Sequence, residues 1–408
     1  MDSLTQIVLG AAVGETVAGK RLGNRAMMWG AIGGTIPDID VFATLFFPEV
    51  EALALHRGFS HSILFSLTFP FILALATYGL YSSGLYQKKY YKTFVFILSV
   101  FVACGFVIMS ALLLFKWGSW FRWPLFLLLA GGIVFSLFQL YRNYLQAQLH
   151  GVHLSYWRWY VLFFWAIITH ALLDCFTTYG TQLYSPFNSL RVAWNSISVI
   201  DPLYTLPLMI CLIVSAFYAM KSQRRKHWNY LGLGLSTFYL VFTLINKQFI
   251  NRIAETTIHE EGIVYHRYMT TPTLLNNILW SVTIDSGDTI YTGLYSMWDK
   301  EKKFKLHGVP RNLHLRSEVS HKSEFKTLEW FTDEYYTLVY TDHSFIQMND
   351  LRFGTIDGEK PGDKNFVFSF IIKNLPEGKM DFTMVSGRPS ENERNQYLQR
   401  LFSRIKGI

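Results

Sequence analysis

The amino-acid sequence predicts an α-helical polytopic membrane bundle, with about six long spans after a short N-terminal helix pair, followed by a mainly β soluble domain. Of its 408 residues, 51% are hydrophobic and only 16% are charged, whereas about a quarter of the residues in a soluble domain are charged. Residues 1–249 hold 17 Lys and Arg and 8 Asp and Glu, and residues 250–408 hold 20 and 21. We therefore predict a membrane-embedded domain at 1–249 and a separate domain at 250–408.

The first domain contains runs that are long and apolar enough for spanning helices, which need about 20 residues. Two shorter apolar segments, 4–19 and 26–36, precede them and are rich in Gly and Ala, so these helices can pack closely. The six longer runs, which carry few or no charged residues, are 62–87, 93–115, 123–141, 159–190, 192–220 and 228–246.

The second domain shows the period of β-strands. Two alternating runs flank Ser286-Gly287-Asp288, which predicts a hairpin with its turn at these residues. The six histidines of this domain are scattered without the spacing of metal ligands. We expect the chemistry to lie in the first domain.

The basic loops predict the orientation in the membrane. Segments 20–25, 87–92 and 221–226 carry most of the Lys and Arg of the first domain and are placed in the cytoplasm. Segments 36–61 and 179–201, and everything after 246, then lie outside, so the chain is a multi-pass membrane protein with an extracytoplasmic C-terminal domain. Because the positive charge reports topology, we expect no nucleic-acid partner.

The first candidate site follows the second apolar segment. Pro37 should end the preceding helix, and Asp38 and Asp40 come directly after it. In an extended segment the two carboxylates would point the same way, and they would need a cation or an Arg between them. The alternative is that Asp38 caps a following helix.

The second candidate site is the stretch that contains His56, Arg57 and His61, at the entrance of an uncharged run. If a helix starts at Gly58 or Ser60, His61 lies in its first turn, where helix N-termini favour anions. Arg57 could bind a phosphate or a carboxylate through two hydrogen bonds. The alternative is a basic anchor at the membrane interface.

The third candidate site is a pair on one helix. His170 and Asp174 are four residues apart, so both face the same side. They could chelate one ion, or Asp174 could orient the imidazole; the alternative is a buried structural pair. Asp201 opens the fifth span and is interpreted as the N-cap of that helix, with metal ligation as the alternative.

These stretches converge on the outer end of the bundle if their helices pack together. Carboxylates and imidazoles without thiolates suit Zn²⁺, with Mn²⁺ or Fe²⁺ as alternatives. More than four ligands would allow a two-metal site for ester or phosphoester hydrolysis.

The motifs "GTIPDID", "HRGFSHS" and "THALLD", together with the N-terminal "MDSLTQIVLGAAVGE", resemble the YdjM-like family of inner-membrane-bound metal-dependent hydrolases. The resemblance covers roughly residues 1–215. Many relatives have a His after the Thr near the N-terminus, where this chain has Gln6, which puts a second metal in question. The metal ligands that the resemblance implies are Asp38, Asp40, His56 or His61, His170 and Asp174.

We therefore expect an inner-membrane hydrolase with one or two divalent metal ions, held by Asp38, Asp40, His56, His61, His170 and Asp174. A metal-activated water would attack an ester or phosphoester, with Asp38 or Asp40 as general base and Arg57 stabilising the developing negative charge. A site at the boundary between membrane and water suggests a lipid or lipid-linked substrate.

Two other functions explain part of the sequence. A transporter could use the same Asp and His residues to carry a metal or protons, but it would spread titratable residues through the membrane depth. The runs 62–87, 93–115 and 123–141 have none in their middles. A membrane scaffold with a partner-binding β domain would explain residues 250–408 and leave the polar motifs without a role.

Overall fold

The computed structural model of the chain describes residues 1–115, 122–146, 151–341, 345–355, 366–374, 380–386 and 391–407. These residues form two compact units, one of Met1–Pro70 with Val161–Ile408 and one of Phe71–Tyr160. The helical elements are α1 (Ser3–Leu22), α2 (Asn24–Thr35), η1 (Pro37–Leu45), α3 (Glu49–Leu55), η2 (Phe59–His61), α4 (Ile63–Ser82), η3 (Leu85–Gln87), α5 (Lys89–Phe115), α6 (Arg122–Leu140), η4 (Tyr141–Leu145), α7 (Tyr156–Asp174), α8 (Pro202–Phe217), α9 (Gln223–Glu260), η5 (Leu313–Leu315), α10 (Arg316–Val319), α11 (Ser323–Phe331) and α12 (Glu391–Ile405); η4 is a π-helix and the other η elements are 3-10 helices.

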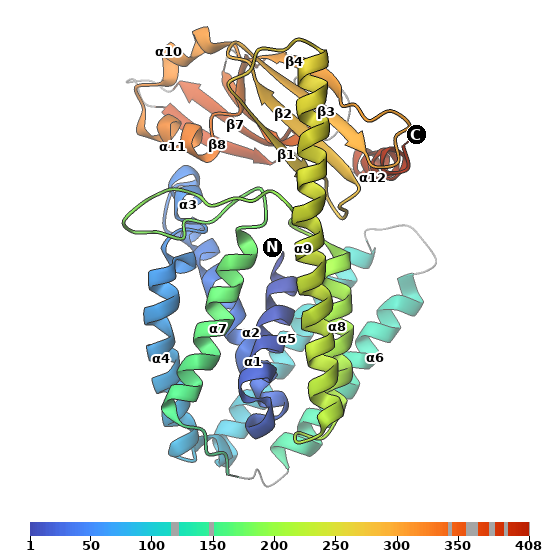
Figure 1. Cartoon of the computed structure of the whole chain (residues 1–408). Coiled ribbons are helices and arrows are strands. Elements are labelled where there is room, and N and C mark those ends of the chain that lie inside the picture. Colours follow the sequence, from blue (N-terminus) through green and yellow to red (C-terminus); the bar gives the residue numbers. More distant parts are fainter. Residues whose placement is uncertain are drawn as a thin grey trace. The chain divides into compact units, whose positions relative to one another are not determined.

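Helices α1, α2, α7, α8 and α9 lie side by side in the first unit (Figure 1). The contact between α1 and α2 is as close as their Gly and Ala content predicts, because glycines face one another across it. A Cβ atom placed on Gly34 would lie 2.7 Å from the carbonyl oxygen of Gln6 and 3.0 Å from Cα of Gly10. This packing holds the end of α2 against α1, next to the candidate site.

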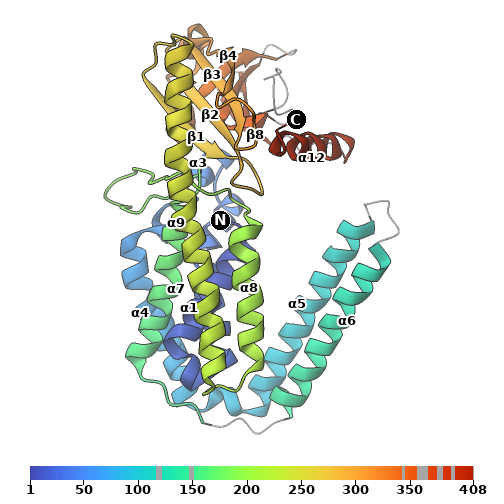
Figure 2. The ribbon, with the colours of Figure 1, turned by 45° about the vertical axis from the view of Figure 1, so that its right-hand side comes forward.

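The prediction of a helical part followed by a β domain is confirmed, but six spans are not. Among the described residues, three helices are long and apolar enough to cross a membrane: α4, the segment Phe126–Leu145, which comprises most of α6 together with η4, and α9. Helix α8 is apolar but shorter. In the second unit, α5 and α6 pack against each other (Figure 2).

Two predicted spans are interrupted by an irregular segment. The run 159–190 is helical only to Asp174, where α7 ends, and the run 192–220 is helical only from Pro202. The segment between these helices folds over the bundle end and forms an isolated bridge from Thr181 to Val192. Its apolar residues Cys175 and Ile197 are buried. The apolar composition of this segment therefore does not mark a spanning helix, and its apolar side chains are divided between buried ones and exposed ones such as Phe187, which is 84% exposed.

The C-terminal part contains two antiparallel sheets of four strands each, in the orders β1-β2-β3-β4 and β5-β6-β7-β8. The predicted hairpin is β2 and β3, in which Asp285 pairs with Ile290 across a turn where Gly287 has a φ of +86°. Such a φ favours glycine because it has no Cβ. The strands are β1 (Arg267–Pro272), β2 (Leu279–Asp285), β3 (Thr289–Ser296), β4 (Lys305–Pro310), β5 (Tyr336–Tyr340), β6 (Ile346–Thr355), β7 (Phe366–Asn374) and β8 (Met380–Ser386).

Helix α9 joins the bundle to the first sheet without a break (Figure 2). The predicted domain boundary at residue 250 falls inside this helix, and the first strand begins only at Arg267. Beyond the boundary, Ile250, Ile253 and Ile258 pack on a sheet residue, Trp280, in one hydrophobic core. The end of α9 therefore belongs to the C-terminal domain.

Candidate metal centre

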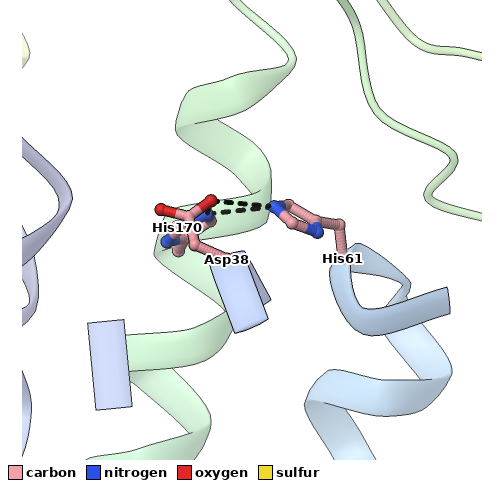
Figure 3. A group of neighbouring side chains, drawn as sticks. All are labelled: Asp38, His61 and His170. Atoms are coloured by element: carbon pink, nitrogen blue, oxygen red, sulfur yellow. Dashed lines mark hydrogen bonds and ion pairs between the residues drawn. The ribbon is translucent and has the colours of Figure 1, made fainter. Parts of the chain in front are cut away.

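Within the described part of the chain, one group of side chains could bind a metal ion. It consists of Asp38, His61 and His170 (Figure 3). Nε2 of His61 lies 3.1 Å from Nε2 of His170. Oδ1 of Asp38 lies 3.7 Å from the first nitrogen and 3.5 Å from the second. Bonds of about 2.0–2.2 Å to a tetrahedral ion place neighbouring donors about 3.4 Å apart. The three atoms therefore fit one face of a coordination shell.

The two imidazole rings direct lone pairs at each other. Nδ1 of His170 lies 2.5 Å from the carbonyl oxygen of Gly34, which can only accept a hydrogen bond, so Nδ1 carries the proton. Nδ1 of His61 lies 3.1 Å from Oδ2 of Asp40, which as a carboxylate also only accepts. In their neutral forms both rings then have an acceptor at Nε2, next to the acceptor on Asp38, and either a proton on Nε2 of His61 or a bound cation relieves this contact. A cation between them satisfies all three, and metal-binding histidines commonly have Nδ1 fixed in this way.

The positions of Asp38 and Asp40 differ from the predicted extended segment. Both lie in η1, where side chains two residues apart are turned by about 240°. Asp38 consequently faces His170, whereas Asp40 faces His56. Asp38 forms no helix cap, because the residue before η1 is Ile36 and no side chain caps this element. The two carboxylates act on the same histidine, His61, from two sides.

Asp40 organises the His56–His61 stretch through its two oxygens. Oδ1 lies 2.8 Å from Nδ1 of His56. Oδ2 accepts hydrogen bonds from the amide of Arg57 at 2.9 Å and from the hydroxyl of Ser60 at 2.8 Å, in addition to its contact with His61. Both oxygens are therefore occupied by groups of the chain, and Asp40 sets the orientation of His61.

A helix start at Ser60 would place His61 in the first turn of the helix. In the structure His61 lies before α4. The 3-10 helix η2 ends at His61, and Ser62, which has extended backbone angles, separates it from α4. The hydroxyl of Ser62 accepts a hydrogen bond from the amide of Phe65 at 3.0 Å, so Ser62 supplies the cap. His61 is therefore held in a turn, with its side chain fully buried.

Asp174 reaches the same point from α7. Its Oδ2 lies 3.5 Å from Nε2 of His61 and 3.7 Å from Nε2 of His170. Both members of the predicted helical pair therefore face the site. Oδ2 forms no hydrogen bond within the described residues although it is buried.

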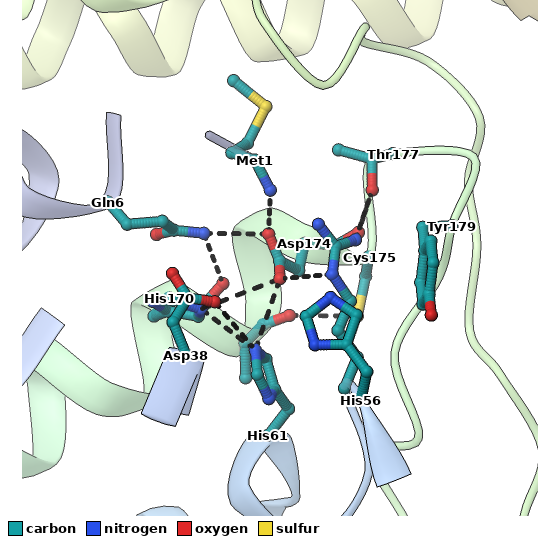
Figure 4. Close-up of polar contacts among 12 residues, drawn as sticks. Met1, Gln6, Asp38, His56, His61, His170, Asp174, Cys175, Thr177 and Tyr179 are labelled. Atoms are coloured by element: carbon teal, nitrogen blue, oxygen red, sulfur yellow. Dashed lines mark hydrogen bonds and ion pairs between the residues drawn. The ribbon is translucent and has the colours of Figure 1, made fainter. Parts of the chain in front are cut away.

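Asp174 is surrounded by donors (Figure 4). Nε of Arg57 lies 3.0 Å from Oδ2, while Oδ1 accepts a hydrogen bond from Nε2 of Gln6 at 2.8 Å and contacts the amino group of Met1. The guanidinium of Arg57 also donates to the hydroxyl of Thr177 at 2.8 Å. Arg57 therefore neutralises Asp174, and its contact with a substrate anion stays a prediction.

The charges of the two η1 carboxylates are stabilised by the histidines. Burial acts to raise the pKa of Asp38, but hydrogen bonds with His170 and His61 hold it well below its usual range. Burial also opposes ionisation of Asp40, and His56 and His61 hold its pKa low. Burial acts to lower the pKa of His61, but hydrogen bonds with Asp38 and Asp40 raise it. Asp38 and Asp40 are thus two ionised carboxylates, whose negative charge faces a positive charge on His61 or on a bound cation.

The comparison with protein families decides the assignment of the chain. The family described as YdjM inner membrane protein matches residues 1–250. The chain belongs to the YdjM inner membrane protein family. The match contains every residue of the candidate centre and ends before β1. No curated protein matches the chain, and no solved structure does.

The YdjM segment brings together all six predicted ligands, but in different roles. Asp38, His61 and His170 have ligand atoms positioned for one ion. Direct ligation by Asp40, His56 and Asp174 stays a prediction, because their nearest polar neighbours are groups of the chain.

The C-terminal domain, which lies outside the YdjM match, contacts the wall of the site through Tyr179. The ring of Tyr179 packs edge-on against His56, with centroids 5.1 Å apart, and against Phe331 of α11 at 5.3 Å. The guanidinium carbon of Arg57 lies 4.9 Å from the centre of the same ring. Burial raises the pKa of Tyr179 to about 12, so it is a neutral phenol.

Sequence reasoning overlooked Thr177 and Tyr179. They follow Asp174 by three and five residues, in a Thr- and Tyr-containing stretch that could have been recognised as a polar continuation of the motif. The carbonyl of Gly34, which orients His170, could not have been found, because a backbone acceptor leaves no mark in the sequence. These three groups set the positions of the side chains that the motifs supply.

Proposed function

We propose that this YdjM-family protein is a membrane-bound metal-dependent hydrolase that acts on an ester or a phosphoester. The observation that supports it is the pair of buried Nε2 atoms of His61 and His170, 3.1 Å apart, with both Nδ1 atoms already bonded. Buried acceptors that face each other are costly unless a proton or a cation lies between them. Two imidazoles and the carboxylate of Asp38 form the donor set of a catalytic zinc site with an open position, and they also suit Fe²⁺ or Mn²⁺.

The residues of the centre would have separate roles in hydrolysis. When bound, a divalent ion lowers the pKa of a water molecule and polarises the oxygen of the scissile group. Hydrolysis joins the water oxygen to phosphorus or to the carbonyl carbon and breaks the bond to the leaving oxygen. One proton of the water goes to the leaving oxygen and the other to a carboxylate, which we assign to Asp38 or Asp40. Arg57 offers positive charge next to the group.

The experiment is metal analysis of the purified full-length protein. We expect about one equivalent of a divalent metal in the wild type and a loss of at least tenfold in His170→Ala, because one of the three donors is removed. His259→Ala, at an exposed position of α9, is the matched control and should keep the metal. Helical circular dichroism confirms that each variant is folded. Equal metal content in the His170→Ala and wild-type proteins would contradict the proposal.

The second element of the proposal is that the site lies outside the cytoplasm. The basic loops 20–25 and 221–226 meet at one end of the bundle, where Nη1 of Arg225 donates to Oδ1 of Asn24 at 2.8 Å. The candidate centre and the C-terminal domain lie at the other end. A periplasmic reporter fused after Ile408 should be active, and a cytoplasmic reporter at the same position should be silent. The opposite pair of results would reverse the orientation.

A further inference from the structure

The segment next to the candidate centre is apolar and uncovered. In η1, the exposed fractions are 52% for Ile39, 60% for Phe42 and 73% for Leu45, and Phe46 directly after it is 81% exposed. Removing one such side chain from water contributes about 1.5–3 kcal/mol. Four of them in eight residues form a surface that is stable only when something apolar covers it.

This surface continues two helix faces that the bundle leaves open. Met28 and Ile32 of α2 are 47% and 38% exposed, and they lie one turn apart just before η1. On its other side η1 packs against η2, where Phe59 is 49% exposed and contacts Phe65 of α4, with ring centroids 5.7 Å apart. Because α4 is a candidate membrane span, the surface borders apolar side chains that would face lipid.

The same surface borders the accessible side of the centre. The side chain of Asp38 is 22% exposed, whereas those of His61 and His170 are 0% and 1% exposed. Asp38 belongs to η1, so the exposed edge of the centre lies on the same short element as Phe42 and Leu45. A water-soluble substrate gains nothing from these residues, whereas an amphiphile gains the free energy of covering them.

We propose that the substrate is a membrane lipid, which enters sideways over η1 and is cleaved at the ester or phosphoester between its chains and its head group. The acyl chains cover Phe42, Leu45 and Phe46 while the polar head reaches Asp38. This inference rests on the proposed hydrolase function for the cleavage step, but the contact of η1 with lipid stands independently of it.

The first test measures what covers Phe46. A nitroxide on Phe46→Cys, in a Cys104→Ser background and in vesicles of phosphatidylethanolamine and phosphatidylglycerol, should be relaxed by oxygen and protected from chromium oxalate. Leu67→Cys on α4 is the lipid-facing control, and Tyr340→Cys in the C-terminal domain is the water-facing control. A label at position 46 that behaves like position 340, or disulfides between two copies of the unlabelled Phe46→Cys protein, would overturn the proposal.

The second test separates lipid entry from chemistry. We compare hydrolysis of the same vesicles with hydrolysis of p-nitrophenyl phosphate and p-nitrophenyl acetate. The triple variant Phe42→Ser, Leu45→Ser, Phe46→Ser should lose at least tenfold more of its rate on vesicles than on the soluble esters, with its metal content kept. Val264→Ser, also an exposed apolar position, should leave the ratio of the two rates as in the wild type. An unchanged ratio in the triple variant overturns lipid entry, whereas a wild type without metal overturns the hydrolase function.

Discussion

Two groups of buried charges lie at opposite ends of the helical bundle, and they differ in how well their atoms are satisfied. Near the basic loops, Nε and Nη2 of Arg225 donate to the two oxygens of Glu15 at 2.6 and 2.5 Å, and Nη1 donates to Asn24 and to the carbonyl of Tyr218. One acid meets one base, and each guanidinium nitrogen has a partner. At the other end, Nε2 of His61 and Nε2 of His170 lie 3.1 Å apart, and two neutral rings with their protons on Nδ1 would have no donor between them.

The comparison shows that burial of a charge is by itself weak evidence for function, whereas buried side chains whose ligand atoms converge in metal-binding geometry point to a ligand. The Glu15–Arg225 pair is complete within the chain and needs no ligand. The group of Asp38, His61 and His170 could hold a cation. The two ends should therefore respond differently to substitution: the first in stability and the second in metal affinity.

The largest effect is expected for Arg225→Met. It leaves the carboxylate of Glu15 buried without its partner, which should destabilise the protein by about 3–5 kcal/mol. The double variant Glu15→Leu, Arg225→Met removes both charges and should recover most of this loss. Unfolding of the protein in detergent, monitored by circular dichroism, measures both. The metal content of the folded fraction should stay at the wild-type value, and a loss of metal without a loss of stability would remove the distinction between the two ends.

An intermediate effect is expected for Asp40→Asn. The amide replaces one of the oxygens that fix Nδ1 of His61, so the metal should bind about 10–100-fold more weakly while the fold is kept. Competition with a chelator measures the affinity. Asp288→Asn, at an exposed turn of the C-terminal domain, is the control and should bind metal as the wild type does. An Asp40→Asn protein with wild-type affinity would show that Asp40 does not orient a ligand.

The smallest effect is expected for Asp201→Ala. Oδ1 of Asp201 accepts a hydrogen bond from the amide of Leu203 at 3.0 Å, and its Oδ2 accepts one from the hydroxyl of Tyr239 at 2.9 Å, which confirms its interpretation as an N-cap. Loss of the cap should lower the free energy of unfolding by about 1 kcal/mol. The metal content should not change. A metal-deficient Asp201→Ala protein would instead support its alternative role as a ligand.

Elements with strong local signals could be predicted from the sequence, and the ends of apolar runs could not. The close α1–α2 contact follows from Gly and Ala content, and the β2–β3 hairpin from its turn residues around Gly287. Hydrophobicity, however, does not report backbone conformation. The stretch after Asp174 is apolar but irregular, with Ile197 buried and Phe187 exposed, and α9 continues past residue 250 because its apolar side chains pack on a sheet.

The members of the candidate site could be predicted, but not what each of them contacts. Spacing alone placed His170 and Asp174 on one helix face, and both reach the centre. The separate roles of Asp38 and Asp40 depend on the 3-10 conformation of η1, which turns one towards His170 and the other towards His56. That conformation results from packing of η1 on η2 and α3, which no local pattern of residues reveals.

The unbroken course of α9 limits how the length of this chain can change. Its 38 residues span about 57 Å, well beyond the roughly 30 Å of a bilayer core, so the C-terminal domain stands on a rigid stalk. Inserting one residue in the stalk would turn the domain by about 100° and raise it by about 1.5 Å. The hydrogen bond of 2.9 Å from Arg191 to the carbonyl of Trp330 could then not form. Relatives that carry the same domain should therefore vary in loop length and keep the length of α9, because even seven inserted residues, which nearly restore its facing, would raise the domain by about 10.5 Å.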